Sequence, residues 1–267
     1  MAETNLETRR IALLFDGDNA QASLVEKIIA EVSKYGIISV RRIYGDWTTP
    51  QMHSWKDLLN THSIQPMQQF RYTVGKNATD SALIIDAMDI LHDGYVNGFA
   101  IVSSDSDYTR LATRIREKGF FVLGIGKLTT PKAFVNACEI FVYTENLAEE
   151  TRKKPIPRTT DESSTAAEPT DVVPLLKSAI DSVQQDDGWA SLGPIGQRLH
   201  QLDPGFDPRT YGYRQLSQLI KAHKDVFEIN EKKSASGPTQ IYIRINEPEP
   251  EIKPKPRRRR RSRKKEE

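Results

Sequence analysis

Apolar runs alternate with helical repeats of apolar residues over the first 150 positions. The continuous run at 11–15 is typical of a strand buried on both faces. Further strands are predicted at 37–44, 64–70, 99–103, 120–125 and 140–143, and helices at 20–35, 50–61, 79–92, 107–118 and 131–137. Strands that alternate with helices predict an α/β fold, a sandwich of helices around a mainly parallel sheet.

The pattern changes after a polar stretch. Positions 172–183, 192–202 and 213–223 have helical spacing, and two short strands follow at 226–229 and 240–245. Three helices followed by a two-stranded ribbon are typical of a small winged-helix domain. We therefore expect a first domain at 1–150, a flexible linker at 151–170, a winged-helix domain at 171–246 and a disordered basic tail at 247–267.

Composition narrows the class of protein. The chain has 267 residues, of which 37% are hydrophobic and 28% are charged, enough to bury a core. Its one cysteine, Cys138, forms no internal disulfide and supplies no multi-thiolate zinc site. No apolar run approaches the ~18 residues of a membrane span, and the run near the N-terminus is too short for a signal peptide. We expect a cytoplasmic protein with no membrane partner.

The formal net charge is only +2, but basic residues are concentrated at the C-terminal end. A block of like charge repels itself and attracts polyanions. We predict RNA binding by this block; a merely solubilising tail is the alternative. Its core is Arg257, Arg258, Arg259, Arg260 and Arg261.

Two acidic clusters directly follow predicted strands. Asp16 opens one cluster, which continues to Asn19, and the other contains Ser104, Asp105 and Asp107. The carboxyl ends of parallel strands lie at one rim of a sheet, where ligands bind. We expect both clusters at the same rim, although each alone also suits a helix cap.

A third source of carboxylate is the predicted helix 79–92. Counting by three and four from Asp80 reaches apolar positions, among them Leu83, Ala87 and Leu91. A carboxylate on a buried stripe requires a partner, and a shared cation can serve. Hard divalent cations such as Mg²⁺ or Mn²⁺ select oxygen ligands. We therefore predict a metal site that is also the catalytic site, formed by Asp16, Asp80, Asp105 and Asp107.

Basic and aromatic residues near the predicted strand ends suit an RNA partner. Cations are needed around a phosphate backbone, and aromatic rings stack on bases. The candidate cations are Arg41, Arg42, Arg71, Lys76 and Lys127, and the candidate rings are Tyr44 and Trp47. The alternative for Arg41 and Arg42 is a solvated strand edge, and for Trp47 it is core packing.

Four segments resemble the NYN domain, a LabA-like branch of the PIN-like metal-dependent ribonucleases: LLFDGDNAQ, RRIYGDW, VGKNATDSALIIDAMD and AIVSSDSDYTRLATRIREKG. The resemblance covers about 9–147 and implies an α/β/α sandwich with Mg²⁺- or Mn²⁺-dependent cleavage of RNA. It places the family's acids at Asp16, Asp80, Asp105 and Asp107, with Asn19, Asp86 and Ser104 as supporting residues.

The segment at 171–246 resembles the OST-HTH/LOTUS domain, most clearly in GYRQLSQLI. That family implies RNA binding or the docking of a protein partner, and it occurs fused to NYN nucleases. Core packing of any winged helix is the alternative explanation for the same apolar positions.

Three functions remain open at this point. The first is a metal-dependent ribonuclease that cuts RNA internally, with its metal held by Asp16, Asp80 and Asp105 and with Asp107 as a ligand or neighbour. The second is an RNA-binding adaptor whose nuclease site is silent. The third is a phosphatase, since Asp16-Gly17-Asp18 resembles the nucleophile loop of haloacid-dehalogenase-like enzymes, but Ala20 departs from that pattern. The oligomeric state is not predicted.

Overall fold

A computed structural model describes residues 9–70, 78–149, 171–232 and 240–246. The predicted linker at 151–170 and the basic tail lie outside these residues. Among the described helices, none is long and apolar enough to cross a membrane.

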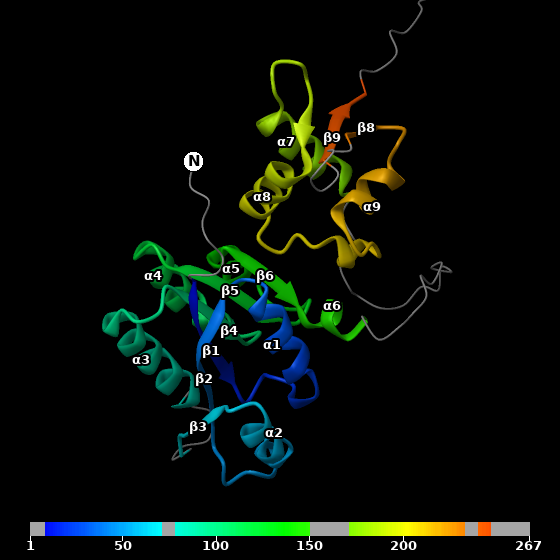
Figure 1. Ribbon diagram of the computed structural model, residues 1–267. Coiled ribbons are helices and arrows are strands. Elements are labelled where there is room, and N and C mark those ends of the chain that lie inside the picture. Colours follow the sequence, from blue (N-terminus) through cyan, green and yellow to red (C-terminus); the bar gives the residue numbers. More distant parts are fainter. Residues whose placement is uncertain (1–8, 71–77, 150–170, 233–239, 247–267) are drawn as a thin grey trace, which may run out of the picture.

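The first domain is built on a six-stranded parallel sheet (Figure 1). Its strand order is β3-β2-β1-β4-β5-β6, so the chain starts in the middle and builds outward to both edges. The strands are β1 (Arg10–Asp16), β2 (Ile37–Gly45), β3 (Gln65–Gln68), β4 (Gly98–Val102), β5 (Phe121–Gly126) and β6 (Ile140–Tyr143). This arrangement confirms the predicted α/β class.

Helices cover both faces of the sheet (Figure 1). One layer consists of α3 (Ala78–Asp93), α4 (Thr109–Glu117) and α5 (Lys132–Ala137). The other consists of α1 (Val25–Ser33), the 3₁₀ segment η3 (Pro50–Trp55), α2 (Lys56–Thr61) and α6 (Thr144–Glu149). Alternate residues of β1 point into the two layers: Ala12 and Leu14 into the first, Ile11, Leu13 and Phe15 into the second. Both sides of β1 are therefore core.

The second domain is a helical module with a small antiparallel sheet. Its elements are α7 (Val173–Val183), α8 (Leu192–Leu202), the 3₁₀ segment η5 (Pro208–Tyr211), α9 (Leu216–Ala222), β7 (Ala190–Ser191), β8 (Phe227–Lys232) and β9 (Gln240–Ile245). They enclose a separate core that includes Leu176, Ile195 and Ile243. The expected two-stranded ribbon was incomplete, because β7 pairs with β9 and adds a third strand.

Several boundaries differ from the predicted ones. The helix expected at 20–35 begins as a 3₁₀ turn, η2 (Ala22–Leu24), and the one expected at 107–118 begins as η4 (Ser106–Tyr108). The helix expected at 213–223 is shorter, because Gln215 is extended and α9 begins only at Leu216. Short α6 was not predicted from the sequence.

Candidate metal centre and RNA contacts

The two acidic strand ends lie at the same rim of the sheet. β1 pairs directly with β4, and Phe15 lies opposite Val102. Asp16 therefore ends β1 next to the point where the chain leaves β4 at Ser103. This pairing confirms the expectation that both clusters lie at the same rim of the sheet.

Three carboxylates meet in front of this rim, and we call them the acidic cluster: Asp80 from α3, and Asp105 and Asp107 from the turn after β4. One carboxylate oxygen from each lies within 4.8 Å of one from each of the others. Tyr108 donates a hydrogen bond from its hydroxyl to Asp80 Oδ1 over 2.7 Å. This hydroxyl is neutral, so it orients the Asp80 carboxylate without balancing its charge.

Local hydrogen bonds fix the turn that carries two of these acids. The Asp105 amide donates to Ser103 Oγ over 3.0 Å, and the Asp107 amide donates to Asp105 Oδ1 over 2.9 Å. Asp105 caps η4 in this way and still contributes an oxygen to the acidic cluster. Asp105 can therefore cap the helix and act as a metal ligand at the same time.

Asp16 lies beneath the acidic cluster and is not one of the three grouped carboxylates. It is fully buried. Its Oδ2 accepts hydrogen bonds from Asn19 Nδ2 over 2.7 Å and from Ser103 Oγ over 2.8 Å, and its Oδ1 accepts from the Asp18 amide. Asp16 therefore holds together the ends of β1 and β4, which support the acidic cluster.

The electrostatics of the site favour a bound cation. Burial raises the pKa of Asp80, and the neighbouring charges of Asp16, Asp105 and Asp107 raise it further, against the hydrogen bond from Tyr108. Burial also raises the pKa of Asp16, although its hydrogen bonds oppose this. Like charges held close together repel, and a divalent cation among them removes that repulsion.

The donor set fits Mg²⁺ or Mn²⁺. Asp80, Asp105 and Asp107 offer carboxylate oxygens, the ligands that these hard ions prefer. Among the described residues, no other group of three His, Cys, Asp or Glu side chains comes together in this way. The acidic cluster can therefore hold a divalent cation.

Two residues of this site were missed by the sequence analysis. Ser103 links Asp16 to the Asp105 turn, whereas the predicted supporting residue, Ser104, accepts a hydrogen bond from the Lys127 amide over 2.9 Å. Tyr108 orients Asp80. A serine at the end of a buried strand was the available signal for Ser103.

Asp86 has a different environment from Asp80, although both lie on α3. Arg42 forms an ion pair with Asp86, and Tyr44 donates a hydrogen bond to the same carboxylate. Tyr44 is 1% exposed, so the suggestion that its ring stacks on RNA bases was wrong. The ring packs in the core under α3 instead. Asp86 thus balances the charge of Arg42 within the first domain.

The other candidate RNA contacts are only partly described. Arg41 donates to the His62 carbonyl over 2.7 Å, so its guanidinium already binds the first domain. Trp47 packs against the core, and its Nε1 donates to the Met67 carbonyl. Arg71, Lys76 and the tail arginines at 257–261 lie outside the described residues.

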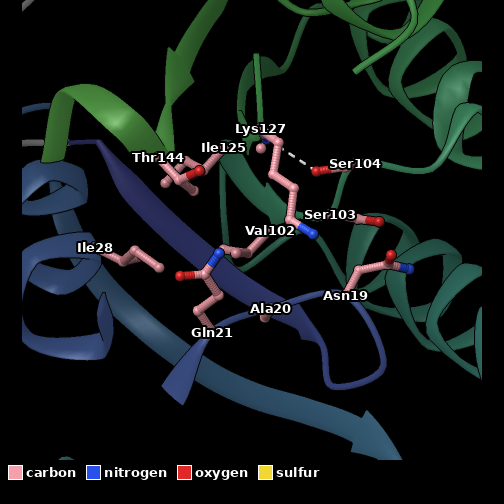
Figure 2. Close-up of a pocket in the computed structure, with 11 residues that line it drawn as sticks. Asn19, Ala20, Gln21, Ile28, Val102, Ser103, Ser104, Ile125, Lys127 and Thr144 are labelled. Carbon is pink, nitrogen blue, oxygen red and sulfur yellow. Dashed lines mark hydrogen bonds between the residues drawn. The ribbon is translucent and has the colours of Figure 1, made fainter. Parts of the chain in front are cut away.

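A small pocket lies at the carboxyl ends of β4 and β5 (Figure 2). Asn19 and Ser103, both bonded to Asp16, belong to its wall, as do Ile28 of α1 and Thr144 of α6. Lys127, an exposed residue after β5, extends its side chain over the pocket toward Ser103 and Asn19 (Figure 2). The pocket thus combines a cation and neutral donors next to the carboxylate of Asp16.

Solved structures that resemble parts of the chain include proteins from three bacteria. A protein of unknown function from Vibrio parahaemolyticus is 19% identical, with a TM-score of 0.43, and the match covers 53% of this chain and 96% of that one. An uncharacterized protein from Nitrosomonas europaea is 30% identical, with a TM-score of 0.28 and coverage of 37% and 93%. A protein from Chromobacterium violaceum is 35% identical, with a TM-score of 0.24 and coverage of 30% and 84%. No curated protein matches significantly.

The family comparison covers both domains. Residues 10–146 match the NYN domain, and residues 164–238 match the OST-HTH/LOTUS domain. NYN domains are PIN-like nucleases, and OST-HTH/LOTUS domains bind RNA. The order of the two matches confirms the predicted fusion. The chain belongs to the NYN domain family and carries an OST-HTH/LOTUS domain after its NYN domain.

Proposed function

We propose that the protein is a metal-dependent endoribonuclease whose centre is the acidic cluster. The observation that carries this proposal is the convergence of Asp80, Asp105 and Asp107 within 4.8 Å at the carboxyl rim of an NYN sheet. The buried Asp16 and its hydrogen bonds to Asn19 and Ser103 support that convergence. The phosphatase alternative has no such support beyond one short sequence likeness.

Each acidic residue has a distinct task in this proposal. Asp80, Asp105 and Asp107 hold the divalent ion, and Asp16 fixes the strand ends from which Asp105 is presented. A divalent ion held there supplies charge neutralisation at the phosphodiester and lowers the pKa of a water molecule. Tyr108 fixes the orientation of the Asp80 carboxylate through its 2.7 Å hydrogen bond to Oδ1.

Lys127 supplies the positive charge that a phosphate needs beside this centre. Its backbone is fixed by the hydrogen bond to Ser104, and its side chain extends over the pocket next to Ser103 and Asn19 (Figure 2). A lysine ammonium and neutral donors together bind a phosphate of the RNA backbone. Lys127 thereby aligns the strand along the rim. The OST-HTH domain and the basic tail add affinity for RNA.

The test is cleavage of a mixed RNA pool with Mg²⁺, Mn²⁺ or EDTA. We expect cleavage with one or both ions and none with EDTA. Asp105→Asn should lower the rate by about 100-fold or more, as expected for loss of a metal ligand, and should leave RNA affinity nearly unchanged. Asp93→Asn, an exposed change at the end of α3, is the matched control.

Two results would contradict the proposal. Wild-type turnover by Asp105→Asn at equal metal would remove the acidic cluster from the reaction. Absence of cleavage with either ion, together with salt-sensitive RNA binding, would favour the RNA-binding adaptor. The OST-HTH domain and basic tail would suffice for that function.

A further inference from the structure

Residues 204–210 of the OST-HTH domain contact the nuclease domain. This segment lies between α8 and α9 and faces α1, β6 and α6 of the first domain (Figure 1). The contacts are of three kinds, ionic, backbone and steric, and each involves different residues.

The ionic contact centres on the guanidinium of Arg209. Its two terminal nitrogens donate to the two carboxylate oxygens of Glu31 on α1, each over 3.1 Å. The same guanidinium binds Asp207 of its own domain, with Nη2 2.7 Å from Oδ2. Burial alone would lower the pKa of Arg209, but the hydrogen bonds to Asp207 and Glu31 raise it instead. Glu31 and Asp207 are 4% and 8% exposed, so this bidentate contact is shielded from water.

Backbone and side-chain hydrogen bonds add to the ionic contact. The amide of Phe141 in β6 donates to the Pro204 carbonyl over 2.7 Å. Asn146 of α6 donates from Nδ2 to Thr210 Oγ1 over 2.9 Å. The segment therefore binds the last strand of the sheet and the helix that follows it.

Close approach at Gly205 completes the interface. A Cβ atom at this position would lie 2.6 Å from the Tyr143 hydroxyl oxygen and 3.2 Å from Val135 Cγ1. Gly205 has no positive φ, so the need for glycine here is one of space between the domains. A larger side chain would push the domains apart without removing any charge.

The docked segment touches the elements that form one wall of the pocket at the carboxyl ends of β4 and β5. Ile28, in that wall, precedes Glu31 by one turn of α1. Thr144, also in the wall, lies between Tyr143 and Asn146, both of which meet the OST-HTH segment. Ile28 and Glu31 lie one turn apart on the same face of α1, so the interface and the pocket adjoin on this helix.

We propose that the OST-HTH domain is a docked, positioning part of the nuclease, and that residues 204–210 hold α1 and α6 in place beside the carboxyl ends of β4 and β5. This inference rests on the proposed ribonuclease function for its effect on cleavage, but the docking is measurable without any cleavage. It predicts that undocking lowers turnover even on RNA too short to bridge the two domains. A domain attached only by a flexible tether would change capture of long RNA alone.

The experiment compares Gly205→Leu with Gly193→Leu in the full chain. Gly193 lies near the start of α8 with no atom within 4 Å of a Cβ, so its variant adds the same side chain away from the interface. The first readout is hydrogen–deuterium exchange at the Phe141 amide. We expect at least about tenfold faster exchange in Gly205→Leu and no change in Gly193→Leu, because the first variant breaks the bond to Pro204.

The second readout is cleavage of a short single-stranded oligonucleotide, with kcat and KM measured separately. We expect kcat to fall about tenfold in Gly205→Leu, a loss typical of a misplaced site, and to stay unchanged in Gly193→Leu. Arg209→Ala should act in the same direction as Gly205→Leu through a different contact.

Three outcomes would overturn the inference. Unchanged exchange at Phe141 in Gly205→Leu and Arg209→Ala would show that the domains are not docked. Faster exchange with unchanged kcat on the short oligonucleotide would show docking without positioning. If the wild type cleaves no RNA, the ribonuclease proposal fails, but the docking proposal can still be tested. The affinity for the short oligonucleotide in EDTA then replaces kcat as the readout. A loss of affinity below threefold in Gly205→Leu would show that the docked domain does not position the site.

Discussion

Carboxylates gather at two places in this molecule, with opposite surroundings. At the domain interface, Glu31 and Asp207 share the guanidinium of Arg209. In the acidic cluster, by contrast, the partner of Asp80 is the neutral hydroxyl of Tyr108. Burial raises the pKa of Asp80, and the neighbouring acids raise it further. Carboxylates that meet a guanidinium hold the fold together, whereas carboxylates that meet one another form a site for an external cation.

The same contrast occurs within a single helix. Asp80 and Asp86 are both on α3, six residues apart. Arg42 and Tyr44 bind Asp86, whereas among the described residues no basic side chain forms an ion pair with Asp80. Both are aspartates of the same helix, so their partners decide their roles.

The largest expected effect is on cleavage, and it separates these two acids. Asp80→Asn should lower the rate of RNA cleavage by about 100-fold or more, because it removes an oxygen ligand and its charge. Asp86→Asn should lower it less than tenfold. Single-turnover cleavage with saturating Mn²⁺ measures both. Equal losses would mean that Asp86 also belongs to the reacting centre.

Stability should respond in the opposite order. Asp86→Asn leaves the Arg42 guanidinium without its charged partner at a site that is 18% to 23% exposed, so we expect a loss of about 1–3 kcal/mol in the free energy of unfolding. Asp80→Asn in EDTA should cost nothing or stabilise the protein, because it relieves repulsion. Urea unfolding of both variants checks this. A larger loss in Asp80→Asn would show that its carboxylate is structural.

Metal should stabilise the folded protein only when the acidic cluster is intact. Mn²⁺ at ten times its dissociation constant adds about 1.4 kcal/mol to the stability of a protein with one site, or about 3–6 °C in Tm. We expect this rise in the wild type and its absence in Asp80→Asn. The Glu31→Gln variant should keep the rise, because Glu31 lies at the other carboxylate site. A shift that survives in Asp80→Asn would place the ion elsewhere.

The smallest expected effect is a pH dependence of the OST-HTH domain. Burial lowers the pKa of His200 below its usual 6.5, although Asp207 and Asp203 oppose the shift, and its Nδ1 is buried without a hydrogen-bond partner among the described residues. Below pH 6.5 the unfolded chain therefore binds the proton more readily than the folded one, so stability should fall as pH decreases. Urea midpoints at pH 7.5 and 5.5 should differ less in His200→Gln. An equal difference would assign the effect to other groups.

The sequence predicted the sheet and most of the acidic site for clear reasons. Continuous apolar runs such as 11–15 are typical of strands covered on both faces, and helical counting placed Asp80 on the buried side of α3. Asp105 and Asp107 followed from the rule that parallel strands end at one rim. Each of these inferences needs only local periodicity and one topological rule.

Contacts between distant segments were not predictable in the same way. Asp80 and Tyr108 are 28 positions apart, and Asp16 and Ser103 are 87 apart. Glu31 looked like any polar residue of a surface helix, and Arg209 lies 178 positions beyond it. Tyr44 was assigned to RNA because a strand-end tyrosine carries no sign of burial, which only the packing of α3 provides. Periodicity identifies a face, but only the fold identifies the partner.

The contact between Phe141 and Pro204 has a consequence for solubility. β6 is one outer edge of the parallel sheet, and an open edge is a template for strand addition and aggregation. The Pro204 carbonyl occupies a backbone donor of that edge. The opposite edge, β3, is four residues long like β6, but it contains Pro66, which has no N–H group to donate. Loss of the docked domain would therefore uncover the β6 edge of the sheet. Two copies of the nuclease can join at such an open edge.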